Sequence, residues 1–400
     1  MNIFVTGIGI LTGLGNGKTE NLNAILEEKT AISEIKILQS KHTELPAAEV
    51  KLTNAEMCDM LDYQEDSVCT RTELMGRIAL KEALEDAKIN SATKGDIAFV
   101  SGTTVGGMDK SEQFYTQFLD INDLTNSAYI ESHDCGTTTE SIAKQFNGKF
   151  CLITTISTAC SSALNAIVLG ANLIKAGQCE IAVVGGSECI SKFHFNGFNT
   201  LMILDKQLCR PFDKTRTGLN LGEGAAYIVL ESENSMQKRQ IKPYCKLLGY
   251  ANTCDAYHQT ATSPEGKGAS LAMQKAIAKS NLQPIDIQYV NAHGTGTNNN
   301  DETEGFAVST IFGNNIPPIS SLKSYLGHTT SAAGSVEAAI SILAMQNDFI
   351  PANLNFKEKD EKINFAPNNH NILNHKYNNF ITNSFGFGGN DSSCVFEKDF

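Results

Sequence analysis

Short apolar, β-branched runs alternate along this chain with segments whose apolar residues recur at helical spacing, and this alternation most constrains the fold. The runs 97–100 and 181–184 are continuously apolar, as expected of strands buried on both faces. The segment 71–87 places Leu74 and Ile78 on one helix face. This pattern predicts an α/β fold, and 400 residues with 41% hydrophobic content suffice for one large unit or two fused halves.

Charge and hydropathy argue against several classes of function. A net charge of −12 argues against nucleic acid as a partner. No stretch approaches the roughly 18 consecutive apolar residues of a membrane span, and residues 1–7 are typical of a first strand rather than a signal peptide. The 11 cysteines include no Cys-x-x-Cys pair, which indicates reduced thiols in a cytoplasmic enzyme and no structural zinc site.

Cys160 is the first candidate catalytic residue, because it stands where a predicted strand, residues 150–156, meets a predicted helix, residues 161–176. A cysteine at a helix N-terminus faces unpaired backbone N–H groups and the positive end of the helix dipole, and both favour the thiolate. Taken alone, such a cysteine is more often a small buried core residue.

Two histidines downstream change that balance. His293 leaves a predicted strand, residues 287–290, for a glycine-rich turn, and His328 precedes a predicted helix of small residues, 331–346. Each alone is more often structural. Together with Cys160 they suit carbon–carbon bond formation on thioesters: the thiolate holds an acyl group. Two imidazole N–H groups can bind the carbonyl of a malonyl thioester and stabilise the enolate formed when carbon dioxide leaves.

A series of motifs, spread over nearly the whole chain, resembles the β-ketoacyl-acyl-carrier-protein synthases of the elongating, decarboxylating type. In order they are Val5-Thr6-Gly7-Ile8-Gly9, Thr158-Ala159-Cys160-Ser161-Ser162, Arg210-Pro211-Phe212-Asp213, Gly222-Glu223-Gly224-Ala225, Asp255-Ala256-Tyr257-His258, His293-Gly294-Thr295-Gly296-Thr297, Lys323 with Gly327-His328, and Asn383-Ser384-Phe385-Gly386-Phe387-Gly388-Gly389.

The resemblance implies a catalytic role for five residues. Cys160 is the acyl-accepting nucleophile, and His293 and His328 bind the malonyl carbonyl and assist decarboxylation. Lys323 and Glu337 match the lysine and glutamate that pair with each other behind the histidines, where a buried charge pair can fix ring orientation and protonation state.

Four further residues are implied in substrate binding. The backbone N–H groups of Cys160 and Phe387 form the oxyanion hole, and the Phe387 ring gates acyl entrance. Thr295 and Thr297 hydrogen-bond the phosphopantetheine arm or the malonyl group. His258 belongs to a motif near the pantetheine entrance, with a structural role as the alternative.

The implied fold is the thiolase fold, in which two similar α/β halves, here residues 1–240 and 241–400, each carry a mixed five-stranded sheet in a five-layered αβαβα arrangement. The implied enzyme is an acyltransferase that uses no metal or redox cofactor. The phosphopantetheine arm arrives on the acyl carrier protein with the malonyl and acyl thioesters. The family is usually dimeric through a central strand, which implies a homodimer, or a heterodimer with a related subunit.

Three alternatives belong to other classes. A chain-length-factor-like partner subunit typically lacks the nucleophile, which is present here. A thiolase uses a second cysteine as base near the C-terminus, where this chain has the loop 385–389, and Cys394 lies beyond that loop in a predicted strand. A dinucleotide site would need a third glycine where Thr12 stands, so we interpret Gly7 and Gly9 as a tight strand-to-turn connection.

Several departures from the family pattern bear on partner and substrate. The segment 198–210 is shorter than the usual loop, and a region that is often basic includes Glu65 and Asp66. Either a replacement basic patch exists, or the nearby charges are ordinary solvated residues with one internal salt bridge. The residues of that candidate patch are Lys206, Arg210, Lys214 and Arg216. These departures suggest a specialised synthase of a polyene or other secondary-metabolite pathway.

Overall fold

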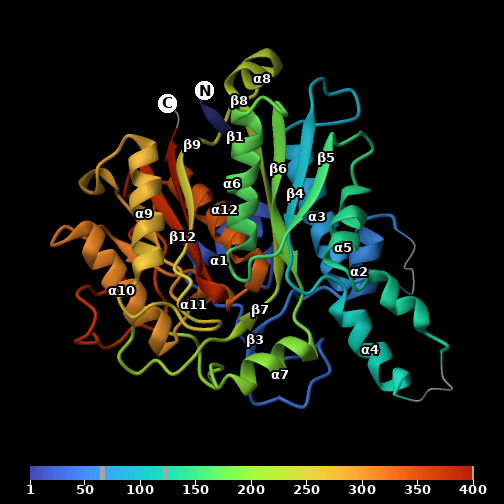
Figure 1. The fold of residues 1–400 in the computed structure, drawn as a ribbon, viewed down its shortest axis with the longest axis horizontal. Coiled ribbons are helices and arrows are strands. Elements are labelled where there is room, and N and C mark those ends of the chain that lie inside the picture. The colour runs from blue at the N-terminus through green and yellow to red at the C-terminus, as the bar shows by residue number, and fades with distance from the viewer. Residues whose placement is uncertain (64–67, 120–123, 399–400) are drawn as a thin grey trace.

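Two strand arrays with the same strand order form the framework of this computed structural model, which describes residues 1–63, 68–119 and 124–398 (Figure 1). Within those ranges, the N-terminal array runs β5-β4-β6-β8-β1 and the C-terminal array runs β11-β10-β12-β13-β9. The strand bounds are β1 Ile3–Thr12, β4 Ile97–Gly102, β5 Leu152–Ile156, β6 Ile181–Glu188, β8 Gly224–Ser232, β9 Cys245–Cys254, β10 Val290–Asn291, β11 Ile319–Ser320, β12 Asn379–Gly386 and β13 Asn390–Lys398.

Strand directions repeat between the arrays as well. β5, β4 and β6 are parallel, and β8 and β1 continue antiparallel; β11, β10 and β12 are parallel, and β13 and β9 continue antiparallel. A short antiparallel pairing of β1 with β9, at Phe4 with Lys246 and Val5 with Cys245, joins the arrays. The division into residues 1–240 and 241–400 stays a prediction, with its boundary in the connection between α8 (Glu233–Arg239) and β9.

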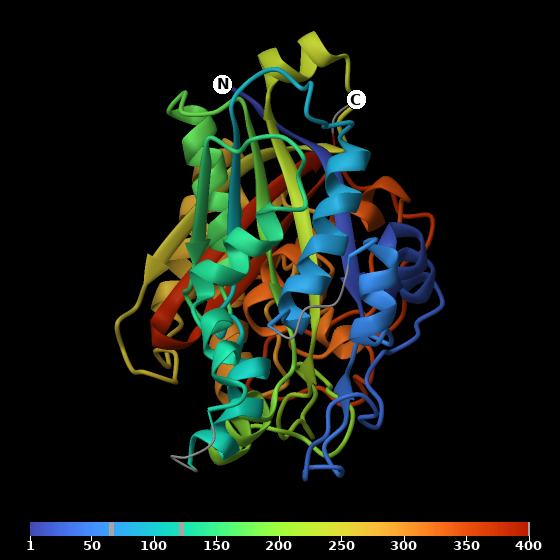
Figure 2. The ribbon, with the colours of Figure 1, turned by 90° about the vertical axis from the view of Figure 1, so that its right-hand side faces the viewer.

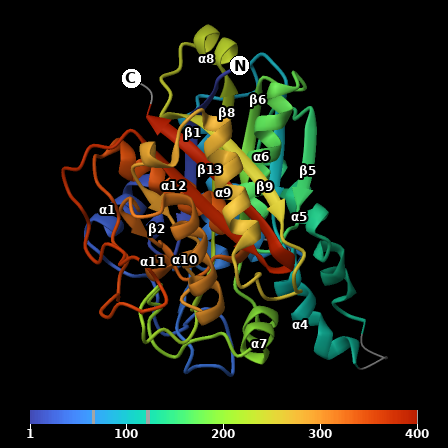
Figure 3. The ribbon, with the colours of Figure 1, turned by 60° about the vertical axis from the view of Figure 1, so that its left-hand side comes forward.

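Helices fill three layers around the two arrays (Figures 1 and 3). α6 (Ser162–Lys175) and α12 (Ala333–Gln346) lie between the arrays; α3 (Arg71–Asp86) and α5 (Cys135–Ala143) cover the N-terminal array, as Figure 2 shows for α3. α9 (Lys267–Ser280) and α10 (Asn298–Phe312) cover the C-terminal one. Separate apolar clusters occupy the middle layer and both outer interfaces. The predicted five-layered thiolase-type fold is therefore confirmed.

Gly7 and Gly9 lie in the middle of β1, so their interpretation as a strand-to-turn connection is wrong. A Cβ atom on Gly9 would lie 2.0 Å from the carbonyl oxygen of Ala79 in α3, and one on Gly7 would lie 2.7 Å from that of Ala83. The glycines therefore allow α3 to pack directly on the backbone of β1.

Helices also form in a polar stretch of the chain. Residues 109–139 contain most of α4 (Met108–Phe118), a 3₁₀ turn at Ser127–Ser132 and the first residues of α5. α4 buries Phe114 but leaves Tyr115 and Phe118 exposed. The strand predicted at 287–290 is reduced to Val290–Asn291, because the Gln288 N–H bonds to the Asn379 side chain.

The remaining described helices are α1 (Gly17–Leu26), α2 (Asn54–Met60), α7 (Lys192–Thr200) and α11 (Lys323–Leu326). Across the described ranges, no helix has the length and hydropathy of a bilayer span.

Candidate active site

Cys160 lies at the turn between β5 and α6, two residues before the first helical residue, as the sequence predicts. The turn is tight: Ala159 has a positive φ of 51°. The hydroxyl of Ser162 stabilises it by donating to the carbonyl of Ala159 (2.6 Å) and accepting the N–H of Thr158 (2.9 Å). The Cys160 side chain is consequently held in a buried position at the beginning of the helix.

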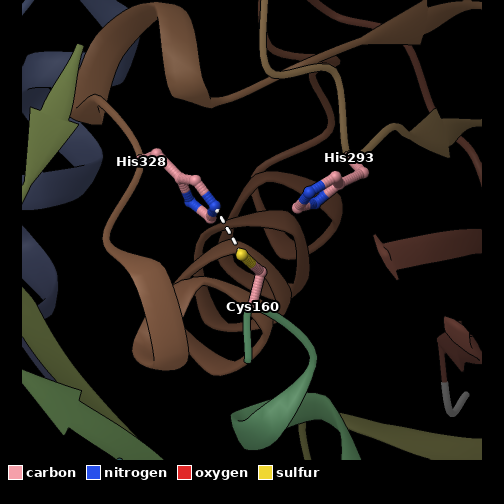
Figure 4. Close-up of side chains that lie close together, drawn as sticks. All are labelled: Cys160, His293 and His328. Carbon is pink, nitrogen blue, oxygen red and sulfur yellow. Dashed lines mark hydrogen bonds between the residues drawn. The ribbon is translucent and has the colours of Figure 1, made fainter. Parts of the chain in front are cut away.

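The imidazoles of His293 and His328 approach the sulfur from two sides (Figure 4). The Nε2 atom of His328 lies 3.0 Å from Sγ of Cys160. One ring nitrogen of each histidine and the sulfur all lie within 4.8 Å of one another. The rings meet edge to face, with centroids 5.4 Å apart. The structure therefore brings together the three residues that the sequence singles out.

Burial makes the resting site electrically neutral. It raises the pKa of Cys160 to about 11, although the charge of Lys323 and the backbone N–H groups of Phe387 and Cys160 lower it. Burial, and secondly the Lys323 charge, hold the pKa values of His293 and His328 well below the usual histidine value. Desolvation thus outweighs the helix dipole that favours a thiolate, and the sulfur needs a proton acceptor, for which His328 Nε2 is in position.

Lys323 and Glu337 form a buried ion pair beside this site. Nζ of Lys323 lies 2.5 Å from one carboxylate oxygen of Glu337, and the other oxygen accepts a hydrogen bond from the Asn291 side chain at 3.3 Å. Both charged side chains are at most 2% exposed. The pairing inferred from the family resemblance is present in the structure, and Asn291 links it to the strand that precedes His293.

A cavity of roughly 270 Å³ leads to the sulfur. Thr295 and Thr297 line it, and their hydroxyl oxygens are 2.8 Å apart. Phe387 also lines it, and its ring stacks on that of Phe198 from α7, with centroids 6.1 Å apart. His258 is exposed and outside the lining, and its Nδ1 atom accepts the N–H of Thr260 at 3.1 Å.

Three buried residues near the site were missed from the sequence. Glu304 of α10 accepts the backbone N–H groups of His293 (2.8 Å) and Gly294 (2.7 Å), and Asp301 accepts that of Gly296 at 3.2 Å. Acids three residues apart after a glycine-rich turn were the available signal. His194 of α7 is also buried, and its charge, when present, would lower the pKa of His328.

The basic patch considered from the sequence is not formed by the two arginines. Arg210 is buried and pairs with Asp205 at 3.0 Å, and Arg216 is buried and pairs with Asp360 at 2.6 Å. Internal ion pairing, the competing interpretation, accounts for both. Glu65 and Asp66, cited in the same context, lie outside the described residues.

Comparisons with known proteins agree with this geometry. The family models "Beta-ketoacyl synthase, N-terminal domain" and "Beta-ketoacyl synthase, C-terminal domain" match residues 1–235 and 244–357. The chain is 32% identical to 3-oxoacyl-[acyl-carrier-protein] synthase 2 of Staphylococcus aureus, over 100% of this chain and 98% of that protein.

Two solved structures are also similar over the full length of the chain. A chain described as the ishigamide ketosynthase/chain length factor has a TM-score of 0.94 at 26% identity, with 100% of this chain and 99% of that chain covered. A ketosynthase from Xenorhabdus doucetiae in complex with its chain length factor has a TM-score of 0.86 at 28% identity, with 100% and 98% covered.

Proposed function

Because this chain belongs to the β-ketoacyl synthase family, we propose that it joins an acyl group held on Cys160 to malonyl-acyl-carrier protein by a decarboxylative Claisen condensation. The product is 3-ketoacyl-acyl-carrier protein, and the enzyme is an acyltransferase of fatty acid or polyketide chain elongation. The observation that carries the proposal is the convergence of the Cys160 sulfur with two neutral, buried imidazoles at the inner end of a cavity.

The first half-reaction loads the acyl group. Sγ of Cys160 attacks the acyl thioester while His328 Nε2, 3.0 Å away, accepts the thiol proton. The carrier thiolate leaves and takes that proton from His328, so the histidine returns to its neutral form. The N–H groups of Cys160 and Phe387, which face the sulfur, can stabilise the tetrahedral oxyanion.

The second half-reaction forms the carbon–carbon bond. The malonyl carbonyl accepts hydrogen bonds from the neutral imidazoles of His293 and His328, and loss of carbon dioxide leaves an enolate on the same oxygen. The enolate carbon attacks the acyl thioester, the bond to Sγ breaks, and the Cys160 thiolate takes from solvent the one proton that the overall reaction consumes. A neutral His328 offers a free Nε2 lone pair in the loading step. To donate from Nε2 to the malonyl carbonyl, the ring must then carry its single proton on that nitrogen, so it changes tautomer between the two half-reactions.

The roles of the surrounding residues follow from their positions. Burial keeps the histidines neutral, and the charge of Lys323, paired with Glu337, acts in the same direction. Thr295 and Thr297 offer hydroxyl groups to the phosphopantetheine arm along the cavity wall. His258, at the outer end, remains a weaker candidate for the same arm. We propose that the carrier-borne arm is the chemical group required besides the two substrates, with no metal or redox cofactor.

We further propose a dimer formed through β5. Among the described residues this strand pairs on one side alone, with β4, and Leu152 and Ile153 are 38% and 41% exposed. An open edge with apolar side chains favours pairing with another strand. A homodimer is the simpler arrangement, and a heterodimer with a related subunit is the alternative. The cytoplasmic location expected from the sequence stays a prediction.

A chain-length-factor-like role is not favoured, because the nucleophile and both histidines converge. A thiolase is not favoured either, because Cys394 is buried in β13 and outside the cavity lining, whereas Phe385 and Phe387 line it. A specialised secondary-metabolite pathway remains our proposal for the reaction's context.

The deciding experiment separates the two chemical steps. Mass spectrometry of the products from malonyl-carrier and a panel of acyl-carriers should show a 3-ketoacyl product with the wild type. Cys160→Ala should abolish it while carbon dioxide release from malonyl-carrier persists, since both histidines remain. Cys151→Ala, at an exposed thiol outside the cavity lining, is the matched control and should keep full activity. Condensation by Cys160→Ala, or none by the wild type with any acyl-carrier, would refute the proposal.

A further inference from the structure

The two donors of the oxyanion hole come from different strand arrays. The N–H of Cys160 belongs to the turn between β5 and α6, the N–H of Phe387 belongs to the turn between β12 and β13, and both face the sulfur. A tetrahedral oxyanion is stabilised fully only when both donors point at the position that its oxygen takes. The spacing of the two turns therefore bears directly on the rate of acyl transfer.

The turn that carries the second donor is short and packs directly on the first turn. Gly386 of β12 pairs with Asn390 of β13, and residues 387–389 make the reversal between them. A Cβ atom on Gly386 would lie 2.9 Å from the Thr158 carbonyl oxygen and 3.2 Å from the Ser161 hydroxyl. The two turns thus meet with no side chain between them.

Asn390 connects the second turn to the helix that begins after Cys160. Its side-chain oxygen lies 2.8 Å from the Ser161 hydroxyl and accepts an N–H of Asn165, in the first turn of α6, at 2.7 Å. The same oxygen accepts an N–H of Asn252 in β9 at 2.7 Å. A single amide oxygen therefore meets donors from both strand arrays and from the helix of the nucleophile.

The donors on the helix side have other partners close by. Ser161 is 0% and Asn165 is 9% exposed, so their hydrogen bonds are made within the protein. The Ser161 hydroxyl also lies 2.7 Å from the Thr158 carbonyl oxygen, and the Asn165 amide donates to the Thr158 hydroxyl at 2.8 Å. Loss of the Asn390 oxygen would therefore leave each donor a local acceptor and remove the link between the turns.

The two histidines are held by contacts outside this link. The His293 N–H donates to Glu304 at 2.8 Å, and the His328 N–H donates to the carbonyl of Asn220 at 2.7 Å. Decarboxylation at the histidines and acyl transfer at the oxyanion hole thus depend on different supports. One substitution can consequently affect acyl transfer while decarboxylation continues.

We propose that Asn390 is a positioning residue for acyl transfer: its side-chain oxygen links the beginning of α6 to the turn of Phe387 and so sets the spacing of the two oxyanion-hole N–H groups. This inference rests on the proposed function and adds a residue that does not line the cavity. Asn390 therefore acts through the two turns and not by contact with the substrate.

The test measures acyl transfer and decarboxylation separately. Asn390→Leu keeps the size of the side chain and removes its acceptor oxygen. It should slow acylation of Cys160 by acyl-carrier about 10- to 100-fold, followed by mass spectrometry in a single turnover. Carbon dioxide release from malonyl-carrier alone should change less than about threefold, because the histidines keep their supports.

Two variants and one reagent serve as controls. Asn390→Asp keeps an acceptor oxygen in place and should be acylated within about threefold of the wild-type rate. Asn172→Leu, at an exposed residue of the same helix α6, is the matched control and should change neither step. Alkylation of Cys160 by iodoacetamide forms no oxyanion, so it should proceed at the wild-type rate in every variant.

Several outcomes would overturn the inference: wild-type acylation of Asn390→Leu, an equal loss of acylation and decarboxylation, slow alkylation of that variant, or slow acylation of Asn390→Asp. If the leucine variant does not fold, Asn390→Ala carries the same prediction, since it inserts no apolar group among the donors. Failure of the proposed function is distinct, because the wild type would then form neither an acyl-enzyme nor a 3-ketoacyl product.

Discussion

Nζ of Lys323 lies 2.5 Å from Oε1 of Glu337, and the pair is buried close enough to the active site for the lysine charge to lower the pKa values of Cys160, His293 and His328. The glutamate balances that charge and lets it remain in the interior. The pair therefore adds to the burial that keeps the histidines neutral, without touching the sulfur.

Replacement of Lys323 should expose this dependence. Lys323→Met leaves Glu337 buried without its cation, which we expect to lower the free energy of unfolding by about 3–5 kcal/mol. The loss of activity on the acid side should also begin at a higher pH, because the histidines protonate more easily. Urea unfolding and pH profiles of kcat check both effects. The double variant Lys323→Met/Glu337→Met should recover most of the stability, and no recovery would show that the charges are not coupled.

The neutral histidines predict how stability depends on pH. An unfolded histidine titrates near pH 6.5, whereas folded His293 stays neutral to a much lower pH. As the pH falls below 6.5, the unfolded state gains a proton that the folded state does not, so stability is lost by up to about 1.4 kcal/mol per pH unit for each such histidine.

His293→Asn should remove one of these contributions. The stability difference between wild type and variant should therefore shift against the wild type by about 1.2 kcal/mol between pH 6 and pH 5. Urea unfolding at pH 5, 6 and 7.5 measures it. A difference that is constant over this range would mean that His293 titrates normally in the folded protein.

The open edge of β5 makes the dimer testable. In a dimer paired through β5, Ile153→Glu would place one carboxylate from each subunit at the shared edge. We expect a monomer, because repulsion between like charges and the cost of desolvating them oppose pairing. Light scattering after size-exclusion chromatography reports the mass. Leu373→Glu, at a 56% exposed residue, is the control and should stay dimeric. A dimeric Ile153→Glu would place the interface elsewhere.

Metal removal distinguishes the acyl site from a metal site. The ligand atoms of Cys160, His293 and His328 are close enough together to bind a cation. The buried positive charge of Lys323 opposes the binding of a cation there, so we expect EDTA and 1,10-phenanthroline to leave activity unchanged. Metal content of the purified protein should be far below one equivalent. Loss of activity that zinc restores would contradict the assignment.

The close contact between β1 and α3 predicts a stability effect. Gly9→Ala puts a Cβ 2.0 Å from the Ala79 carbonyl oxygen, and such overpacking should cost about 1–3 kcal/mol. Gly136→Ala in α5 is the matched control: its Cβ meets no atom within 4 Å, and alanine should stabilise the helix by up to about 1 kcal/mol. Thermal unfolding separates the two. Equal melting temperatures for Gly9→Ala and wild type would contradict the packing argument.

Local sequence signals were sufficient to predict those strands and helices whose buried residues recur at a regular spacing. The buried strands β4 and β6 are continuous apolar runs, and α3 and α6 carry apolar residues at helical spacing. The junction at Cys160 was correctly placed because both neighbouring elements were clear. Family motifs then named the histidines and the charge pair, which no periodicity identifies.

The parts missed depend on contacts between distant residues. β9 has an interrupted burial pattern, and its pairing with β1 and β13 is decided by strands far away in the chain. The turn after β10 is held by Glu304 and Asp301, whose roles appear once α10 is packed against it. The neutral charge state of Cys160 also depends on burial that a helix N-terminus alone does not reveal.

The matching strand orders place Cys160 and His328 at corresponding points, each after the third strand of its array in the chain and before the helix of the middle layer. In the proposed mechanism, one half supplies the nucleophile and the other supplies both imidazoles. Neither half would then catalyse on its own, and the reaction rate would depend on how the two halves are aligned. A mutation along their shared boundary can silence the enzyme while every catalytic side chain remains intact.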